Sequence, residues 1–260
     1  MLKPGSWLPL TQDWSTARSV APCSIFPAPF GGPVALVRDD KKVLLFRGTS
    51  ARPDVAICSA AGRPLGRVLW EGPRLVAAGW TADERLVAVD ERGSVRLHSV
   101  RGERLPQHFS LGPEVEGEGV EEAHVFAGGL VVLTPSRGLW ALPSLDVPRL
   151  VRLPDVAPPG AALHCMAALP PGRSPSGGLE VLAAVDAGVW VVHAAAGTAL
   201  PSSIAQGPIL ALAPSPCGRY VAGWAQDGTL HVWTTDLMGG GRGWGRGGHA
   251  LPPAQPQRQR

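Results

Sequence analysis

The sequence predicts an all-β protein, a β-propeller of about five blade-like units that leave the ring incomplete. Short apolar runs alternate with turn signals along most of the chain. The turn glycines of four similar hairpins recur at intervals of 45, 50 and 40 residues, which is the period of a four-stranded blade. Finally, 33 glycines and 27 prolines among 260 residues are about twice the usual share, and this composition disfavours an architecture of long helices.

The clearest unit lies between residues 74 and 109. Tight turns separate its apolar runs and force consecutive strands to pair antiparallel. Four short strands joined in this way make one propeller blade. The expected strands are residues 75–80, 86–89, 95–98 and 105–109.

The hairpin formed by the second and third strands of this unit is repeated along the chain. Each copy has a glycine in its turn, and we expect these glycines to supply the positive φ that tight turns need. They are Gly93, Gly138, Gly188 and Gly228. An earlier copy, with expected strands at residues 34–37 and 43–46, lies about one period upstream. Five units therefore fit into the chain.

A single blade cannot bury both faces of its small sheet, so neighbouring blades must stack on one another. Trp140, Trp190 and Trp233 follow turn glycines at a short offset, and we expect them to pack between blades rather than to bind a ligand. A two-sheet sandwich would explain the short strands but not the long period. An open ring would leave two blade faces and a strand edge unpaired, so we expect the chain alone to oligomerise or to be poorly soluble.

The composition divides the chain into an N-terminal segment (1–24), the propeller blades (25–238) and a Gly/Arg/Pro/Gln tail (239–260) that is expected to be disordered. Residues 170–178 predict a long surface loop inside one blade, not a domain boundary. The longest stretch without Gly or Pro has 14 residues and a polar turn in its middle, so no transmembrane segment is expected.

The formal charge of +3 comes from the tail, where four arginines lie beyond Met238 without an acid, so residues 1–238 carry −1. A neutral body lacks the basic surface that nucleic-acid binding requires. An alternative remains, a WD-repeat-like adaptor whose Gly/Arg tail, with Trp244, contacts RNA by charge and stacking.

Four cysteines are spread without a metal-binding or redox spacing, and we expect buried free thiols. They are Cys23, Cys58, Cys165 and Cys217. The first residues lack the apolar core of a secretory signal. These observations favour a reducing, cytoplasmic setting.

The sequence predicts no catalytic, cofactor-binding or metal-binding residues. His164 and Cys165 are neighbours in an expected strand, so their side chains point to opposite faces and cannot share a proton. His98, His193 and His231 fall in or at the end of expected third strands and form no triad with Ser and Asp. The hypothesis is a non-enzymatic protein, with a propeller hydrolase as the enzymatic alternative.

Two further sequence patterns do not indicate a binding site. Residues 243–248 match GxGxxG, but no βαβ unit follows to aim a helix at a phosphate. The glutamates between residues 114 and 122 lack the ligand spacing of an EF-hand loop. We interpret them as a solvated acidic loop.

The segment Ala28-Pro29-Phe30-Gly31-Gly32-Pro33-Val34-Ala35-Leu36-Val37-Arg38 resembles the start of the vacuolar protein sorting-associated protein 16 family. Ordered matches continue at similar spacings to Thr134, among them Leu69-Trp70, Gly79-Trp80 and Phe109-Ser110-Leu111-Gly112. A looser similarity extends to about Thr235. The family's Tyr-rich stretch near the N-terminus is missing, since the only tyrosine is Tyr220, and the α-solenoid that follows the propeller in the family has no counterpart here.

The resemblance implies a scaffold subunit of the HOPS and CORVET tethering complexes, which promote SNARE-dependent fusion. It implies protein partners, the other class C tethering-complex subunits, with no nucleic acid, no cofactor and no small-molecule substrate. It also implies a cytoplasmic protein that is peripheral on late endosome and vacuole or lysosome membranes.

Overall fold

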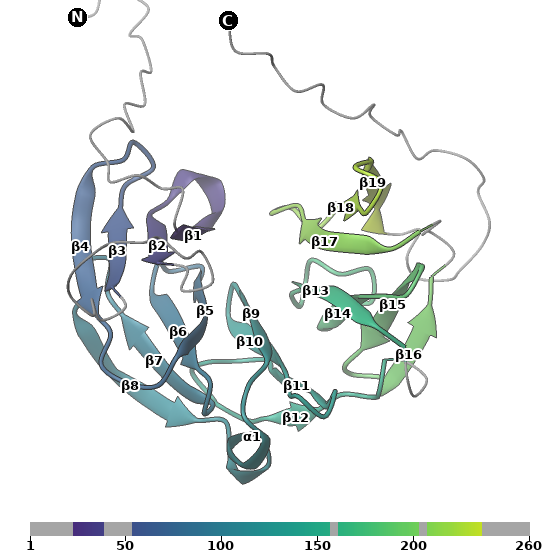
Figure 1. The fold of residues 1–260 in the computed structure, drawn as a ribbon, viewed down its shortest axis with the longest axis horizontal. Helices are drawn as coiled ribbons and strands as arrows, with labels where there is room; N and C mark the ends of the chain where they lie inside the picture. The colour runs from purple at the N-terminus through teal and green to yellow at the C-terminus, as the bar shows by residue number, and fades with distance from the viewer. Residues whose placement is uncertain (1–22, 39–53, 157–160, 203–206, 236–260) are drawn as a thin grey trace, which may run out of the picture.

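The computed structural model describes residues 23–38, 54–156, 161–202 and 207–235. These residues form five small antiparallel sheets set side by side around a common centre (Figure 1). The first strands of neighbouring blades contact one another and lie innermost. The all-β class and the five propeller blades predicted from the sequence are confirmed.

Blades 1 to 3 each have four strands paired in chain order. Blade 1 contains β1 (Cys23–Pro27), β2 (Val34–Arg38), β3 (Asp54–Cys58) and β4 (Pro64–Leu69), with a 3-10 turn at Pro29–Gly31. Blade 2 contains β5 (Leu75–Trp80), β6 (Leu86–Asp90), β7 (Ser94–His98) and β8 (Arg104–Ser110). Blade 3 contains β9 (Glu122–Phe126), β10 (Gly129–Leu133), β11 (Leu139–Leu142) and β12 (Val151–Arg152).

Blade 4 also has four strands, whereas the described part of blade 5 has three. Blade 4 contains β13 (Leu163–Leu169), β14 (Glu180–Val185), β15 (Gly188–His193) and β16 (Thr198–Pro201). Blade 5 contains β17 (Ile209–Pro214), β18 (Tyr220–Ala225) and β19 (Leu230–Thr234). The outer edge of β19 has no partner among the described residues.

Each pair of consecutive blades is joined by a buried apolar cluster. Alternate residues of the strands supply it, as the period of two requires. The clusters join blades 1 and 2 around Trp80, blades 2 and 3 around Leu97, blades 3 and 4 around Val181, and blades 4 and 5 around Trp233. No cluster among the described residues joins blade 5 to blade 1.

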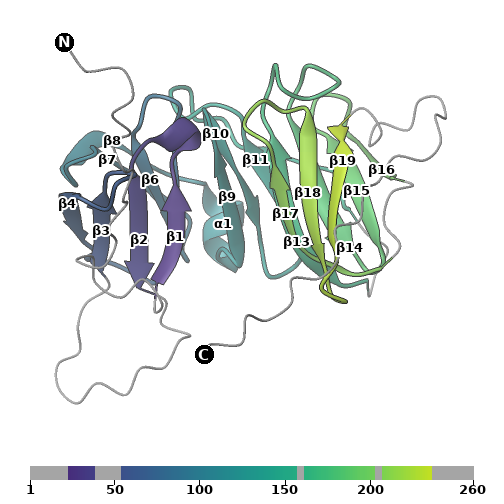
Figure 2. The same cartoon turned by 90° about the horizontal axis from the view of Figure 1, so that it is seen from above.

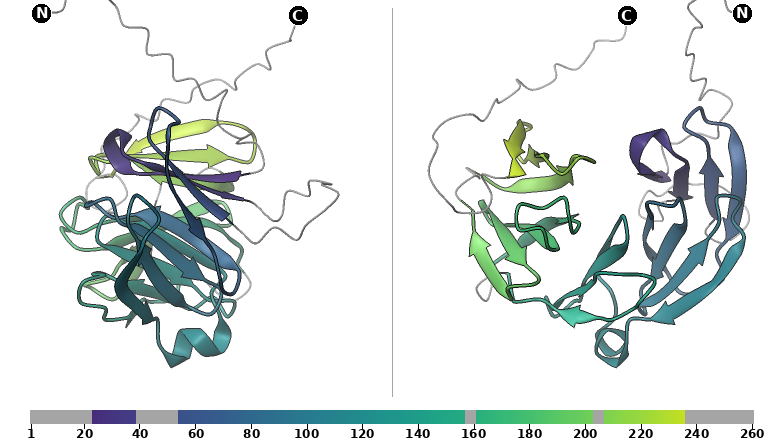
Figure 3. Two further views of the ribbon diagram at one scale, coloured as in Figure 1. Left: turned by 90° about the vertical axis from the view of Figure 1, so that its left-hand side faces the viewer. Right: turned by 180° about the vertical axis from the view of Figure 1, so that it is seen from behind.

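Blades 1 and 5 stand on either side of an opening in the arc (Figures 1 and 2). The view from behind shows the same opening (Figure 3). Among the described residues, four blade interfaces are packed by apolar clusters, and blades 5 and 1 share no such cluster.

Most predicted strands lie within two residues of the observed ones, and residues 170–178 do form a loop inside blade 4, between β13 and β14. The predicted partner of β2 is wrong. On both of its sides β2 pairs with described strands, β1 and β3. Residues 43–46, where the partner was expected, lie outside the described residues. A tight turn was expected after β2, but the next strand of the blade begins only at Asp54.

The acidic loop expected at residues 114–122 contains a short helix, α1 (Pro113–Glu118), at the outside of the arc (Figure 1). Pro113 at its first turn has a φ preset for a helix, and the glutamates of that turn face the positive end of the helix dipole. Val115 is fully buried against blade 2. The burial of Val115 therefore favours a short helix in a segment whose glutamates alone indicate a loop.

The tryptophans were correctly predicted to pack between blades. Trp233 is buried in the cluster of blades 4 and 5, and Trp140 and Trp190 are half-buried against the two clusters before it. The guanidinium of Arg152 lies 5.9 Å from the centre of the Trp140 ring. All three tryptophan rings therefore contribute to the packing between blades.

The turn glycines follow two patterns. Gly93 and Gly228 have φ values of 80° and 84°, as expected. At the other two turns the expectation is wrong, because the left-handed residue is the one before or two before the glycine, Arg137 with φ 70° and Asp186 with φ 48°. A glycine in the sequence therefore predicts where the turn lies, but not which of its residues has a positive φ.

The two patterns predict different effects of a Gly→Ala substitution on the stability of the fold. Gly93→Ala should destabilise the fold by roughly 1–2 kcal/mol, because a Cβ is disfavoured at positive φ and would lie 3.2 Å from Val115 Cγ1. Gly188→Ala should be neutral or slightly stabilising, since the nearest atom to its Cβ is 3.8 Å away and Ala restricts the unfolded chain. Urea unfolding of both variants tests this. Equal losses of stability would contradict it.

Candidate interaction site

The loops between the first and second strands of blades 1 to 4 meet around a cavity of about 280 Å³. Blade 1 contributes Pro29 and Gly32, blade 2 contributes Glu84, blade 3 contributes Ala127 and blade 4 contributes Arg173. The cavity therefore lies where the inner ends of four blades converge. Its lining is mostly small residues, with one acidic and one basic side chain.

The loop of blade 1 is shaped by its own sequence. The backbone N–H of Ala28 donates to Pro33 O at 2.8 Å and closes the loop, and Gly31 takes a φ of 80°. A Cβ on Gly32 would lie 2.9 Å from Ala28 Cβ and 3.2 Å from Glu84 Oε1, so the approach of Glu84 depends on glycine there. The segment that carries the family resemblance thus lines this cavity.

Hydrogen bonds between blades hold this cavity in place. Trp80 Nε1 donates to Phe26 O at 2.9 Å and joins blades 1 and 2. The backbone N–H of Ala82 donates to Ala127 O at 2.8 Å and joins blades 2 and 3. The lining residues are therefore held by contacts between blades as well as by the local structure of each loop.

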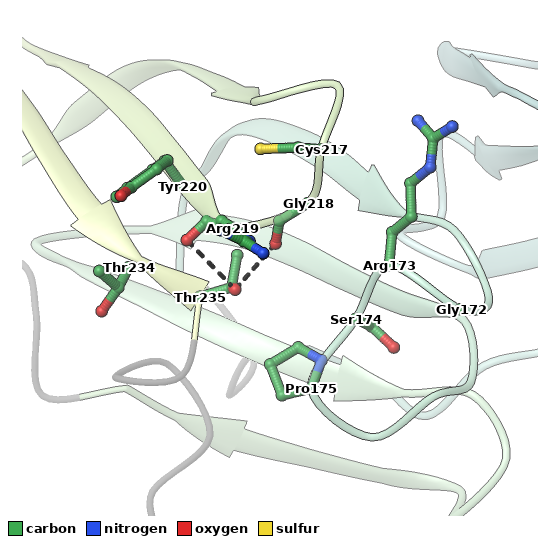
Figure 4. A pocket seen from close by; sticks show the side chains of 10 residues that line it. All are labelled: Gly172, Arg173, Ser174, Pro175, Cys217, Gly218, Arg219, Tyr220, Thr234 and Thr235. Carbon is green, nitrogen blue, oxygen red and sulfur yellow. Dashed lines mark hydrogen bonds between the residues drawn. The ribbon is translucent and has the colours of Figure 1, made fainter.

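A second cavity, of about 420 Å³, lies between blades 4 and 5 (Figure 4). The loop after β13 forms one side, and the turn before β18 and the end of β19 form the other. Arg173 Nη1 donates to Pro216 O and ties the loop to the turn. Gly218 has a φ of 73°, and a Cβ there would lie 2.3 Å from Arg173 O. The two blades can approach this closely only because position 218 is glycine.

The charged residues that line this second cavity are two arginines, Arg173 and Arg219. No carboxylate is among the residues that line it. The thiol of Cys217 is exposed at the wall and lies 3.3 Å from Ser215 Oγ. That hydrogen bond, with a smaller contribution from the backbone of Arg219, lowers the pKa of the Cys217 thiol. The cavity is therefore a cationic, polar pocket with a thiol at its wall.

None of the four cysteines forms a disulfide. Cys58 and Cys165 are buried, and burial raises the pKa of Cys58 and raises that of Cys165 to about 11. The expectation of burial is wrong for Cys217, which is exposed, and Cys23 is half-buried. Cys217 lies in a turn rather than a strand, so no neighbouring blade covers it.

The histidines that the structure describes do not assemble into a catalytic group. His164 is exposed and Cys165 is buried, so they face opposite sides of β13 as expected. His98, His193 and His231 lie in three different blades. His193 Nδ1 lies 3.3 Å from Glu180 Oε1, and His231 stacks on Trp233 at 5.4 Å. Across the described ranges, no group of three or more His, Cys, Asp or Glu could hold a metal ion.

Buried His98 predicts a pH dependence of stability. Burial lowers the pKa of His98 in the folded state below the ordinary value of 6.5. Below about pH 6.5 the unfolded state therefore binds more protons than the folded state, and stability falls as the pH falls. Urea unfolding at about pH 7.5 and about pH 5.5 should show a smaller acid loss for His98→Leu than for the unchanged chain. His164→Leu, at an exposed site, is the control, and equal acid losses in all three proteins would contradict the prediction.

Sequence reasoning missed both cavities. Their residues lie on five loops and the adjoining strand ends, and only the packing of consecutive blades brings these together. The one signal was the Gly/Pro-rich segment 28–33, which reads as a tight turn. The predicted tail (239–260), with its GxGxxG match, and most of the N-terminal segment (1–24) lie outside the described residues. None of the helices that the structure describes has the length and apolarity to cross a bilayer.

The blades define the class of the protein, a β-propeller with WD-repeat-like blades. Of solved structures, the β-propeller domain of Cps50 (Swd1) from Myceliophteria thermophila superimposes with a TM-score of 0.58 and 14% identity, over 84% of this chain and 67% of that one. The C-terminal WD40 domain of Sif2 gives 0.50 and 12%, over 83% and 56%. At these identities the likeness shows the fold alone.

The sequence places the chain more narrowly. The family model "Vps16, N-terminal region" matches residues 10–172, and the chain belongs to this family. A vacuolar protein sorting-associated protein 16 homolog of Dictyostelium discoideum is 30% identical over 80% of this chain and 26% of its own length. Protein VACUOLELESS1 of Arabidopsis thaliana is 31% identical over 64% and 20%. The chain spans about a quarter of the length of the curated relatives it matches. These matches confirm the resemblance to a vacuolar protein sorting family that the sequence motifs indicate.

Proposed function

We propose that the chain is the N-terminal propeller of a non-enzymatic scaffold subunit in a HOPS/CORVET-type tethering complex. It acts in protein transport to the vacuole or lysosome and the late endosome. The observation that carries the proposal is the family match over residues 10–172. The blade architecture supports it, because propellers present many loops on one rigid body.

The proposed partners are the other class C subunits of the complex, and the protein is held at membranes through that complex. Nucleic acid, cofactors and small-molecule substrates are not part of the proposal. The net charge of −1 over residues 1–238 supports this for nucleic acid. The proposed divisions remain an N-terminal segment (1–24), the blades (25–238) and the tail (239–260).

An affinity tag at the start of the gene, at its own locus, tests the proposal. The purified product should carry the other class C subunits in near-stoichiometric amounts, measured by quantitative mass spectrometry against an untagged strain. Recovery of only unrelated complexes would overturn it. RNA retention that is lost on deleting residues 239–260 would favour the adaptor alternative instead, and turnover of an ester, phosphate or glycoside would favour the hydrolase.

A further inference from the structure

We propose that residues 249–252 of this chain form the fourth strand of blade 5, paired antiparallel with the outer edge of β19. This goes beyond the scaffold function, since it concerns how the chain completes blade 5 and holds whichever complex the chain joins. Figure 2 shows β19 beside β18, on the side of blade 5 where no described strand follows. Blades 1 to 4 each have a fourth strand at this place. The pairing concerns the edge of β19 and not the faces of the blade.

The outer edge of β19 has backbone groups that can take a further strand. The backbone N–H of Thr235 donates to Arg219 O at 3.0 Å, so every second residue back from Thr235 turns its backbone groups toward β18. The groups alternate along an antiparallel strand, and therefore Val232 and Thr234 turn theirs outward. An edge of this kind accepts an additional strand through main-chain hydrogen bonds.

The tail contains a sequence that ends strands elsewhere in this chain. The triplet Ala-Leu-Pro occurs four times. Its three described copies, at residues 141–143, 168–170 and 199–201, each lie at the end of a strand, namely β11, β13 and β16. The fourth copy is Ala250-Leu251-Pro252. The first three strands of blade 5 are already present, so the place left for this copy in the blade is the outer one.

Proline suits an outer strand, because the backbone N–H that it lacks can lie on the side without a partner. The outer strands β4, β8 and β16 all contain one. In β16, Pro201 lies opposite Trp190, and the next residue, Ser202, donates its backbone N–H to Val189 O at 2.7 Å. Pro201 therefore lies between hydrogen-bonded pairs, where the ladder needs no N–H from it.

Blade 4 sets the register of the proposed pairing. The strands β15 and β19 follow their turns in corresponding registers. The pairing of β15 with β16, transferred to blade 5, places Leu251 opposite Val232 and His249 opposite Thr234. Val232 and Thr234 are the residues with outward-directed backbone groups, so each pair can exchange two hydrogen bonds. Pro252 then falls between hydrogen-bonded pairs, like the proline of β16.

Chain order favours the tail over the N-terminal segment, which also contains a Leu-Pro pair at residues 8–9. In blades 1 to 4 the fourth strand follows the third in the chain. The fourteen residues 235–248 that would connect β19 to the new strand include seven glycines. A connection of this length and composition can reverse direction, since the entropy cost of closing a loop grows slowly with its length. The N-terminal segment would have to reach blade 5 from blade 1.

The test is hydrogen–deuterium exchange of the full 260-residue chain, resolved to single amides, at concentrations where the chain is monomeric. The amides of Val232 and Thr234 should be protected, because each donates to the added strand. Leu251→Pro removes a paired N–H and should speed the exchange of both amides about tenfold. The amides of His231 and Trp233 point toward β18, so they should stay protected and show that the blade remains folded.

Two proline substitutions serve as controls and should leave the exchange unchanged. Ala254→Pro lies just beyond the proposed strand, and Leu8→Pro makes the same change in the N-terminal segment. Fast exchange of Val232 and Thr234 in the unchanged chain, or protection that survives Leu251→Pro, would overturn the proposal. Protection lost in Leu8→Pro would assign the edge to the N-terminal segment, and protection that rises with protein concentration would assign it to a second copy. Either result would also overturn the proposal.

Discussion

The 260-residue chain on its own should form concentration-dependent oligomers, and Trp224→Glu should shift it toward the monomer. On β18, alternate residues face opposite sides. Val221, Gly223 and Ala225 are buried toward blade 4, whereas Tyr220 and Trp224 are 49% and 44% exposed.

The exposed side of blade 5 is continuous and mostly apolar. Ala211 of β17 and Leu230 of β19 pair directly with Trp224, and directly paired residues share a face. No described residue forms a core cluster on this side. An apolar sheet face of this kind, next to the unpaired edge of β19, associates with other surfaces in water.

Sedimentation velocity over a range of concentrations measures the effect. Trp224→Glu places a charge at the centre of the exposed face and should weaken association by about tenfold or more, the loss expected for an interface aromatic. Val147→Glu is the control, because Val147 is 71% exposed on a loop of blade 3. A monodisperse monomer with a cooperative melt at every concentration would contradict the prediction and would show that five blades suffice.

Trp80→Ala should destabilise the fold by about 3–5 kcal/mol, the usual loss for a buried Trp truncated to Ala. The Trp80 side chain is 3% exposed and packs in the cluster between blades 1 and 2. Its Nε1 also donates to Phe26 O at 2.9 Å, so the truncation removes a hydrogen-bond donor along with the packing.

Trp224→Ala makes the same chemical change at a half-exposed site and serves as the control. Its loss of stability should be small, since most surface substitutions stay within about 0.5 kcal/mol. Urea unfolding followed by circular dichroism, at concentrations where the chain is monomeric, compares the two. Similar losses would mean that the contact between blades 1 and 2 contributes little to the fold.

Much of the fold was predictable because blades repeat a local pattern. The run Leu75–Trp80, for example, was placed at its observed bounds from apolar residues between turn signals. Errors arose where a segment departs from that pattern. The third strand of blade 1 begins after a long connection, and Val115 turns an acidic segment into a helix by burying one side chain. At residues 137 and 186 the turn geometry moves the left-handed position away from the glycine.

The candidate site was hardly predictable at all. Arg173 and Arg219 are 46 residues apart in the sequence, each on an ordinary polar loop. No local signal relates them, because their proximity depends on the packing of blade 4 against blade 5. Even the exposure of Cys217 depends on the packing of these two blades, because its turn lines the cavity left between them.

The all-β class, the strand period, the tryptophans between blades and the family of this protein can all be predicted from the linear sequence. These are local or linear properties, set by hydrophobic alternation, turn chemistry and ordered motifs. The folded arrangement of the blades is needed to see which blade face stays uncovered, which loops meet in a cavity and which thiol is exposed. Those properties depend on contacts between blades that are distant in the chain, and no window of sequence contains both sides of such a contact.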